Sequence, residues 1–404
     1  MNSIVESQFV TCMQPLKYTC THTKNSSNLL KIVLSIIIFP IGIYQIIHSL
    51  IGKLVVPASL KCMNPKSEID LLRTRLIGTS SLENELSRIE SSIENGLETL
   101  KDNKDNNDFL YKNIMSLTRL KVTLIRDFFL KKSFKHKRIT IEVDGYKIDA
   151  MILENSYVVD KDKWVLKSLG NASYYEKELN GMNFYNLLDK TNSNGIVFNY
   201  PGVGESSGFV SRSAMVKAYK AVLSFLEYDK QNGGMGAKEI IGYGYSIGGG
   251  VQGDALKTHI LKNNIKYVFV KDRTFSKLAP VASSIFCKLL GFLVKFFGWN
   301  INPIKSSKTL QHPEIIIQST KDKTNVKKDG IIDNASLIVD DGVIPQKCSL
   351  GFKLLSKNYN NKKTFIGTTK SHNEDIDYSF LAEEIKKSLD QQSDLNVESQ
   401  HPNF

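Results

Sequence analysis

The strongest constraint on the fold is a glycine-serine-glycine turn in the middle of the chain. An apolar strand pattern at 239–245 runs into Gly244-Tyr245-Ser246-Ile247-Gly248, and a helix pattern follows from about 249 to 262. A serine on a sharp strand-to-helix turn adopts strained dihedrals, and the two glycines leave room where side chains would clash. The pattern predicts Ser246 as a nucleophile. The alternative is a tightly packed glycine turn with no chemical role.

Short apolar strands alternate with helix-length segments around this turn. Strand patterns at 139–143 and 146–153 flank Asp144-Gly145, which predicts a β-hairpin. The later strand candidates are 164–169, 196–200, 239–245, 267–270, 315–318 and 364–366. An antiparallel lead-in followed by βα repeats predicts an α/β fold with a mostly parallel central sheet and helices on both faces.

A serine nucleophile needs a base, and the base needs a carboxylate to hold it. His372 is the predicted base because it follows the last strand and precedes a helix expected at about 378–389. Its alternative is an exposed loop histidine. Asp322 is the predicted acid because it lies just beyond the strand at 315–318, although an ordinary solvated aspartate is the alternative. The rival carboxylates are Asp329, Asp333, Asp340 and Asp341.

The oxyanion hole needs one amide from the residue after the nucleophile and one from the loop after the third strand. Ile247 supplies the first, and the turn after 164–169 makes Asn171 or Ala172 the second donor. Another loop, 199–208, contains G-x-G, but Ser207 stands where a dinucleotide motif needs its last glycine. A structural turn is favoured there.

Four ordered motifs together resemble α/β-hydrolases of the H-G-N-A type, a group that includes membrane-tethered protein depalmitoylases, and the chlamydial CHLPS-type proteins. The motifs are Leu169-Gly170-Asn171-Ala172, the loop at 199–208, the segment 242–248 and Ser371-His372-Asn373. The resemblance covers roughly 138–390. It implies an α/β-hydrolase fold with Ser246 as nucleophile, Asp322 as acid and His372 as base. Leu169 stands where these proteins usually have histidine, so loop anchoring and substrate specificity do not carry over.

The N-terminal part lies outside this resemblance. Residues 32–52 contain no Lys, Arg, Asp or Glu, which matches the length of about 20 residues that a transmembrane helix needs. Because Pro40 and Gly42 lie near the middle, a kinked span or a re-entrant hairpin fits as well as a straight helix. The alternative is a buried helix that packs on the catalytic domain.

Two more patterns flank the enzyme-like core. Leucine and isoleucine recur at helical spacing over much of 67–132, with a polar break at 102–108, which predicts an accessory helical pair that braces the fold. The segment 278–299 is strongly apolar apart from Lys288 and Lys295. It predicts an amphipathic lid that receives an acyl chain or touches lipid. A core helix packed on the sheet is the alternative.

These patterns divide the chain into five parts. They are a polar tail (1–28), a hydrophobic membrane-associated segment (29–60), a helical accessory region (61–136), an α/β-hydrolase domain (137–390) with apolar cap helices near 276–300, and a flexible tail (391–404).

The net charge of +12 comes from lysines scattered among Asn and Ser, which indicates mainly a solvated surface and favours membrane adhesion over nucleic-acid binding. Five cysteines without C-x-x-C spacing indicate neither a zinc site nor a disulfide framework, and suit a reducing compartment. No cofactor is implied. The sequence therefore predicts a membrane-associated serine hydrolase that cleaves an ester or thioester with an apolar acyl group, in a lipid or an acylated protein. The alternatives are a serine peptidase or amidase, and a non-catalytic membrane adaptor on a hydrolase scaffold.

Overall fold

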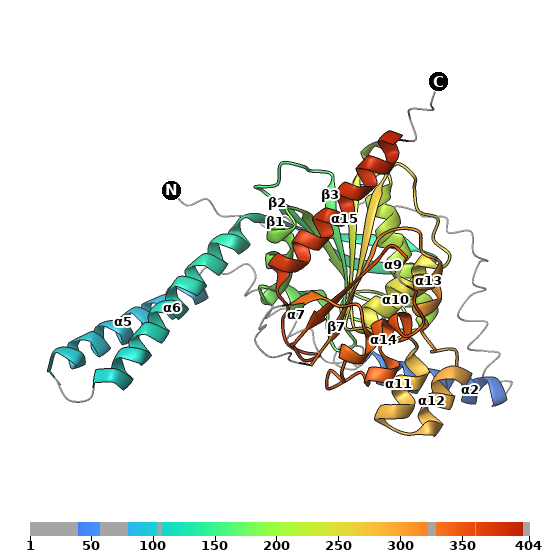
Figure 1. Cartoon of the computed structure of the whole chain (residues 1–404), viewed down its shortest axis with the longest axis horizontal. Coiled ribbons are helices and arrows are strands. Elements are labelled where there is room, and N and C mark those ends of the chain that lie inside the picture. Colours follow the sequence, from blue (N-terminus) through green and yellow to red (C-terminus); the bar gives the residue numbers. More distant parts are fainter. Residues whose placement is uncertain (1–38, 57–79, 103–106, 322–328, 360, 399–404) are drawn as a thin grey trace.

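One mixed sheet organises the chain (Figure 1). The computed structural model describes residues 39–56, 80–102, 107–321, 329–359 and 361–398. Within them the strands are β1 (Phe134–Val143), β2 (Tyr146–Asn155), β3 (Lys163–Ser168), β4 (Asn194–Phe198), β5 (Glu239–Tyr245), β6 (Lys266–Asp272), β7 (Glu314–Ser319), β8 (Gly330–Ile331) and β9 (Lys363–Thr368).

The strand order is β1-β2-β4-β3-β5-β6-β7-β9-β8, which puts the serine-bearing strand β5 in the middle. The pairs β1–β2, β2–β4 and β8–β9 are antiparallel, and the other neighbouring pairs are parallel. This mostly parallel sheet with flanking helices is α/β-hydrolase-like and confirms the predicted fold class. The short edge strand β8 is absent from the sequence prediction because two residues are too few to show an alternating pattern.

The β1–β2 hairpin forms as the sequence predicts. Val143 pairs with Tyr146 across the turn, and both turn residues adopt positive φ, 47° at Asp144 and 81° at Gly145. Positive φ at both central positions matches the right-handed twist of the paired strands, and Asp-Gly tolerates it. The hairpin therefore forms one edge of the sheet, and its strands pair directly across the predicted Asp144-Gly145 turn.

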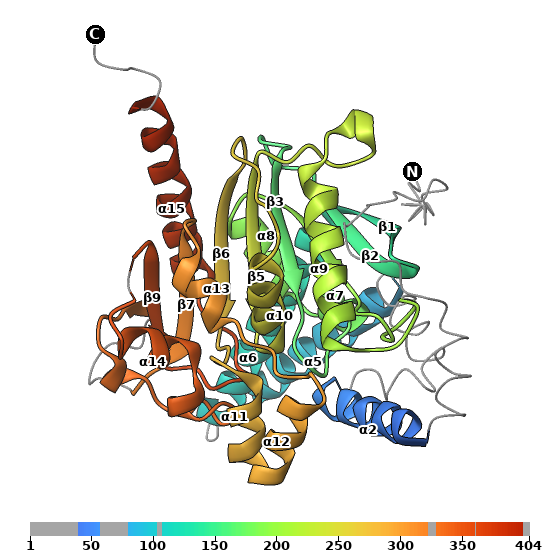
Figure 2. The same ribbon diagram turned by 90° about the vertical axis from the view of Figure 1, so that its right-hand side faces the viewer.

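Helices cover both faces of the sheet. On one face α9 (Arg212–Glu227) and α10 (Ile247–Leu256) share a core with the strands, and Figure 2 shows them in front of the sheet. On the other face lie α7 (Tyr175–Asn180), α8 (Asn183–Lys190) and α15 (Tyr378–Glu398). A third, smaller core joins α13 (Ile304–Thr309) and α14 (Leu350–Leu355) to β7 and β9.

Helix α15 continues into residues that the sequence analysis assigns to a flexible tail. It runs to Glu398 instead of ending near Leu389. The side chain of Gln392 explains part of this extension, because it accepts a hydrogen bond from the Tyr267 amide at 3.3 Å and donates one to the Tyr267 carbonyl at 3.1 Å. A side-chain amide that satisfies both backbone groups of a strand residue ties this turn of the helix to β6.

The N-terminal elements are α2 (Phe39–Val55), α5 (Ser80–Asp102) and α6 (Asn107–Lys132). The latter two form the helical pair expected at 67–132, with Ile89 and Ile114 buried and Lys121 bound to Glu90 at 2.5 Å. Figure 1 shows the pair projecting from the sheet. The polar tail 1–28 and residues 399–404 lie outside the described residues.

The expected membrane span at 32–52 lies only partly within the described residues, which begin at 39. None of the helices in the described ranges is both long and apolar enough to traverse a bilayer. The described part of the apolar run is α2, and one side of this helix packs on the domain that contains the sheet. A Cβ at Gly52 would lie 2.6 Å from the Trp299 ring. The Trp299 indole N–H donates a hydrogen bond to the His48 carbonyl at 3.1 Å. This contact agrees with the alternative of a helix packed on that domain.

The cap helices are α11 (Leu278–Ile285) and α12 (Lys288–Phe296), in the apolar segment after β6. They pack against each other, and both figures show them beside α2 at one edge of the sheet. Because α11 follows the carboxyl end of β6, this is also the edge at which Ser246 follows β5.

Candidate active site

Ser246 lies at the sharp turn between β5 and α10. Its backbone has φ 53° and ψ −119°, a region that costs a non-glycine residue about 1–3 kcal/mol. Two hydrogen bonds hold this conformation: the Ser246 amide donates to the Asp272 carbonyl at 2.9 Å, and the Thr274 hydroxyl donates to the Ser246 carbonyl at 2.6 Å. The neighbouring strand β6 and its loop therefore fix the strained serine.

The two glycines of the turn are required by close packing. A Cβ at Gly244 would lie 2.5 Å from the Cα of Gly249, and one at Gly248 would lie 2.1 Å from the Ser168 carbonyl oxygen. Neither neighbour is a side chain that could turn away, since both are backbone atoms. The steric reason given for the motif in the sequence analysis is confirmed, and the close contact also brings the end of β3 to the serine.

His372 lies in the loop after β9, as predicted. Its Nε2 is 3.0 Å from Ser246 Oγ, and both side chains are largely buried, with His372 only 4% exposed. The alternative of an exposed loop histidine is therefore wrong. A neutral imidazole that meets the serine through Nε2 must carry its proton on Nδ1, which then needs an acceptor.

That acceptor is Asp341. Its Oδ2 lies 2.7 Å from His372 Nδ1, and its Oδ1 accepts the amides of Val343 at 2.9 Å and Ile344 at 2.6 Å. The predicted acid, Asp322, lies outside the described residues. Asp341, one of the four rivals, takes the place that the sequence analysis assigns to Asp322.

The path of the chain explains this displacement. After β7 the chain makes an excursion that includes β8, and it returns where Thr320 pairs with Ile338 and the Val339 amide donates to the Ser319 carbonyl at 2.9 Å. The return brings Asp341 back to the carboxyl end of β7, the strand end from which the sequence analysis expects the acid. The sequence analysis expects the acid at the carboxyl end of the correct strand, β7. The carboxylate that binds His372 there belongs to the returning chain, and not to the aspartate that follows β7 most closely in the sequence.

Arg273 clamps the histidine loop and is missing from the sequence prediction. Its guanidinium is 3% exposed, binds Asp272 through Nε at 2.8 Å and Nη2 at 3.1 Å, and donates through Nη1 to the carbonyls of Ser371 and, at 2.6 Å, Glu374. These carbonyls flank His372. Burial alone lowers the pKa of Arg273, but contact with Asp272 raises it above its ordinary value, so the clamp stays charged.

Tyr245 supports the same loop from the nucleophile strand. Its hydroxyl donates to the His372 carbonyl, and its ring centroid lies 5.3 Å from the imidazole centroid. The Arg273 guanidinium lies over the same ring, 5.4 Å from its centroid. Burial raises the pKa of the Tyr245 hydroxyl, which therefore remains a donor. One sequence signal for Arg273 was available: a charged residue directly at the end of the strand beside the nucleophile strand.

The predicted oxyanion-hole turn lies next to Ser246. A Cβ at Gly170 would be 4.0 Å from the Ser246 Cβ, and Asn171 and Ala172 follow at the exposed surface. The amide of Ile247 begins helix α10 on the other side of the serine. The amides of Ile247 and of Asn171 or Ala172 stay the predicted hydrogen-bond donors of the oxyanion hole.

Leu169 departs from the histidine of the H-G-N-A pattern, and the structure shows how the loop is held. Its side chain is buried in the core, while its carbonyl accepts a hydrogen bond from the Tyr200 hydroxyl at 3.2 Å. Tyr200 also bonds the Ser168 hydroxyl at 2.7 Å. The loop at 199–208 thus anchors the predicted oxyanion turn, which supports the structural interpretation of its glycines. A Cβ at Gly204, for example, would meet Asn199 Nδ2 at 2.4 Å.

No group of three or more His, Cys, Asp and Glu side chains suited to a metal ion occurs among the residues that the structure describes. The groups that the structure brings together at the site are a hydroxyl, an imidazole and a carboxylate.

Several solved structures are similar to the chain. An esterase of Pyrococcus furiosus is 19% identical, with a TM-score of 0.47 over 64% of this chain and 92% of that chain. An alpha-beta hydrolase from Vibrio vulnificus is 16% identical, with a TM-score of 0.46 over 67% and 85%. Carboxyl esterase 2 from the mycorrhizal fungus Tuber melanosporum is 14% identical, with a TM-score of 0.41 over 64% and 88%. Among curated proteins, no sequence matches the chain.

A protein-family comparison covers much more of the sequence. The family described as Chlamydia CHLPS protein (DUF818) matches residues 108–390, which include all of α6 except Asn107, the whole sheet and every residue of the candidate site. Because this match spans well over half of the 404 residues, the chain belongs to the Chlamydia CHLPS protein family.

Proposed function

We propose that this chain is a membrane-associated serine hydrolase that cleaves an ester or thioester bearing an apolar acyl group. One observation carries the proposal: Ser246 Oγ, the His372 imidazole and the Asp341 carboxylate form a continuous hydrogen-bonded series, with separations of 3.0 and 2.7 Å. A hydroxyl in hydrogen-bond reach of a base that is itself oriented by a carboxylate is the arrangement that activates a serine.

The proposed reaction has two halves. His372 Nε2 takes the hydroxyl proton while Ser246 Oγ attacks the carbonyl carbon, and Asp341 stabilises the imidazolium. The amides of Ile247 and of Asn171 or Ala172 hold the developing oxyanion. The proton then passes from Nε2 to the leaving alcohol or thiol, which departs and leaves an acyl ester on Ser246. A water molecule, deprotonated by His372, hydrolyses that ester and regenerates the serine.

Two features support an apolar acyl group. The apolar cap helices α11 and α12 follow directly from the strand and loop that hold Ser246, and the resemblance to depalmitoylases of the H-G-N-A type suggests an acyl thioester. The substrate is then a lipid or an acylated protein. The free thiols of Cys287 and Cys348 fit a reducing compartment for the catalytic domain.

An active-site fluorophosphonate probe tests the proposal. We expect it to label the folded wild-type chain and to leave Ser246→Ala unlabelled, and the same substitution should lower kcat on an acyl thioester by at least about 10⁴-fold. Labelling that survives Ser246→Ala contradicts the mechanism. The rates of turnover of an acyl thioester and of an aminoacyl amide distinguish an esterase or thioesterase from a peptidase or amidase. A folded wild-type chain without labelling or turnover favours the non-catalytic adaptor.

A further inference from the structure

Helices α2, α11 and α12 leave large apolar side chains in solvent. Counting Phe286, which directly follows α11, seven of them are more than half exposed, from 54% at Leu50 to 67% at Phe286. We call these seven the apolar face: Ile46, Leu50, Leu54, Phe286, Leu289, Phe292 and Phe296. Single exposed apolar residues are ordinary, but a concentration of this kind marks an interaction surface.

The two sources of the apolar face are joined by ring contacts. The ring centroid of Tyr44 on α2 lies 4.9 Å from that of Phe297, which directly follows α12. Phe297 in turn lies 5.2 Å from Phe296, and Phe296 lies 5.7 Å from Phe292. Figures 1 and 2 both show α2 beside the cap helices. The N-terminal apolar segment and the cap therefore make one surface.

The segments that form this surface carry charge of a single sign. No Asp or Glu occurs between Asp272 and Glu314, or within α2, whereas α2 carries Lys53 and the cap carries Lys277, Lys288 and Lys295. Within the described part of the chain, none of the three cap lysines has an acidic partner within 4 Å. An apolar surface whose own helices carry only positive charge complements the anionic headgroups of a lipid bilayer.

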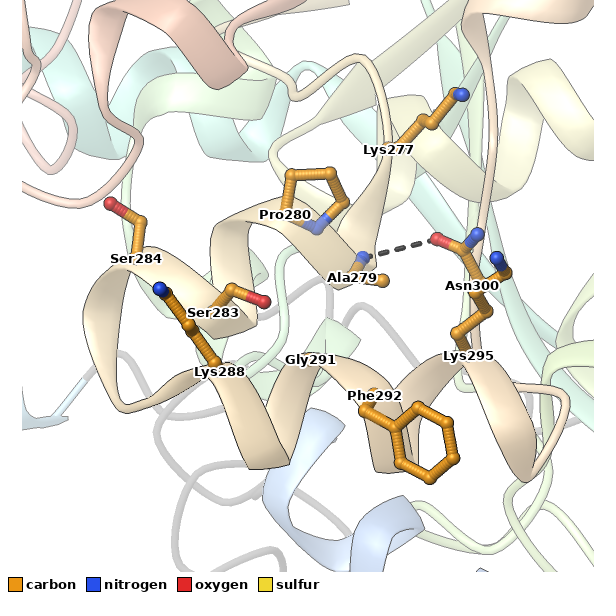
Figure 3. A pocket seen from close by; sticks show the side chains of 10 residues that line it. All are labelled: Lys277, Ala279, Pro280, Ser283, Ser284, Lys288, Gly291, Phe292, Lys295 and Asn300. Atoms are coloured by element: carbon orange, nitrogen blue, oxygen red, sulfur yellow. Dashed lines mark hydrogen bonds between the residues drawn. The ribbon is translucent and has the colours of Figure 1, made fainter.

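A cavity of about 620 Å³ lies between the cap helices. Figure 3 shows the three cap lysines around it, with the hydroxyls of Ser283 and Ser284 near one end and the amide of Asn300 near the other. Lysines and hydroxyls are the side chains that bind phosphate oxygens. Phe292 also lines the cavity, so polar groups suited to a headgroup adjoin a side chain suited to acyl chains.

This surface is close to Ser246 in the fold. Thr274, whose hydroxyl binds the Ser246 carbonyl, lies four positions before Leu278, where α11 begins. A bilayer bound to the apolar face lies at the carboxyl ends of the strands, where Ser246 also lies. A substrate that resides in the bound membrane would then reach the site without crossing bulk water.

We propose that the apolar face and the cap lysines together bind the surface of a bilayer that contains anionic phospholipid. The inference rests on the proposed function in taking the substrate to be lipid-like or acylated, and it deepens that function by naming the surface and headgroup chemistry that bring the enzyme to its substrate. A second copy of the chain fits this surface less well, because a symmetric dimer would bring two sets of unpaired lysines together.

Vesicle co-sedimentation of the full chain tests the proposal. We expect wild type and Ser246→Ala to bind phosphatidylcholine vesicles containing phosphatidylglycerol, and to bind phosphatidylcholine alone at least about tenfold more weakly. The apolar-face variant Leu289→Ser with Phe292→Ser and the charge variant Lys288→Glu with Lys295→Glu should each weaken binding to the mixed vesicles by at least about tenfold. Circular dichroism and thermal melting verify that each variant is folded.

Matched controls carry the same substitutions elsewhere. Val159→Ser with Ile260→Ser removes two side chains that are each 90% exposed near the opposite edge of the sheet, and Lys190→Glu with Lys386→Glu repeats the charge change on α8 and α15. Both should bind like wild type. Equal weakening by the controls, absence of binding to mixed vesicles, or self-association through the apolar face without vesicle binding overturns the proposal. Binding without esterase activity removes the proposed function alone, and turnover of a soluble ester without binding removes this inference alone.

Discussion

Asp341 and His372 are joined by two hydrogen bonds, one through their side chains and one through their backbones. The carboxylate Oδ2 lies 2.7 Å from Nδ1, and the His372 amide donates to the Asp341 carbonyl at 2.7 Å. The backbone bond ties the loop after β9 to the excursion after β7, so the acid and the base are held in register independently of their side chains. Among the predicted candidates that the structure describes, this double contact distinguishes Asp341 from Asp329, Asp333 and Asp340.

The identity of the acid can be tested by two substitutions. Asp341→Asn removes the charge and the preferred acceptor for Nδ1–H, and we expect kcat/KM on an acyl thioester to fall by about 10³–10⁴-fold. Asp322→Asn should stay within about twofold of wild type. Steady-state kinetics on both folded variants decides between them, and the reverse order of effects would restore Asp322 as the acid.

The predicted strands of the core were placed within a few residues, because buried parallel strands are short apolar runs between turn residues. The order of Ser246 and His372 along the chain, each just beyond a strand, was enough to bring them to one edge of the sheet. These are consequences of local pattern and of topology, which a single sequence carries.

The features that the sequence did not predict depend on contacts between segments that lie far apart along the chain. Asp341 reaches its position only because the chain after β7 returns through the Thr320–Ile338 bridge. The apolar run of α2 has the same composition whether it meets lipid or protein, so its contact with Trp299 is invisible in hydropathy. The clamp by Arg273 joins β6 to a loop about 100 residues later, and no spacing rule links the two.

Arg273 is expected to act as a positioning residue. Arg273→Lys keeps the charge beside Asp272 but loses the fork that reaches the Ser371 and Glu374 carbonyls. We expect kcat to fall by about tenfold or more with KM little changed, because the base is misplaced while substrate binding is retained. The measurement is steady-state kinetics on a soluble ester.

A matched control is available at another arginine–aspartate pair. Arg212 binds Asp254 through Nε at 2.6 Å outside the candidate site, so Arg212→Lys should leave kcat unchanged. A folded Arg273→Lys variant with wild-type kcat contradicts the positioning role. Arg273→Ala is a less informative change, since it leaves the buried Asp272 carboxylate without its ion partner and is expected to destabilise the fold by about 3–5 kcal/mol.

Gly248 tests whether the close approach of β3 to the serine turn is essential. Gly248→Ala puts a methyl group where the Ser168 carbonyl oxygen lies 2.1 Å away, so backbone must shift. We expect a loss of at least about 3 kcal/mol in unfolding free energy, or loss of fluorophosphonate labelling if the turn opens. Gly330→Ala, where no atom of the described residues lies within 4 Å of the added Cβ, is the control. Equal stability and labelling of the two variants would show that the turn has room to spare.

We expect His136 on β1 to make the free energy of unfolding depend on pH. Burial, together with the nearby charge of Lys131, lowers its pKa from 6.5 to about 4, and its Nε2 lies 2.7 Å from the Tyr185 hydroxyl. Between those pH values the unfolded chain binds a proton that the folded chain rejects. This contribution to stability is therefore complete above about pH 6.5 and is lost as the pH falls toward 4, by no more than about 1.4 kcal/mol per pH unit.

His136→Gln isolates the effect, because glutamine can still bond Tyr185 but does not titrate. Urea unfolding of both proteins should show wild type losing stability relative to the variant as the pH is lowered from about 6.5 toward about 4. An NMR titration of the His136 ring in the folded wild type should give a pKa near 4. Stability curves that stay parallel over this range, or a ring that titrates near 6.5, contradict the prediction, since either result means that the folded chain accepts the proton as readily as the unfolded one.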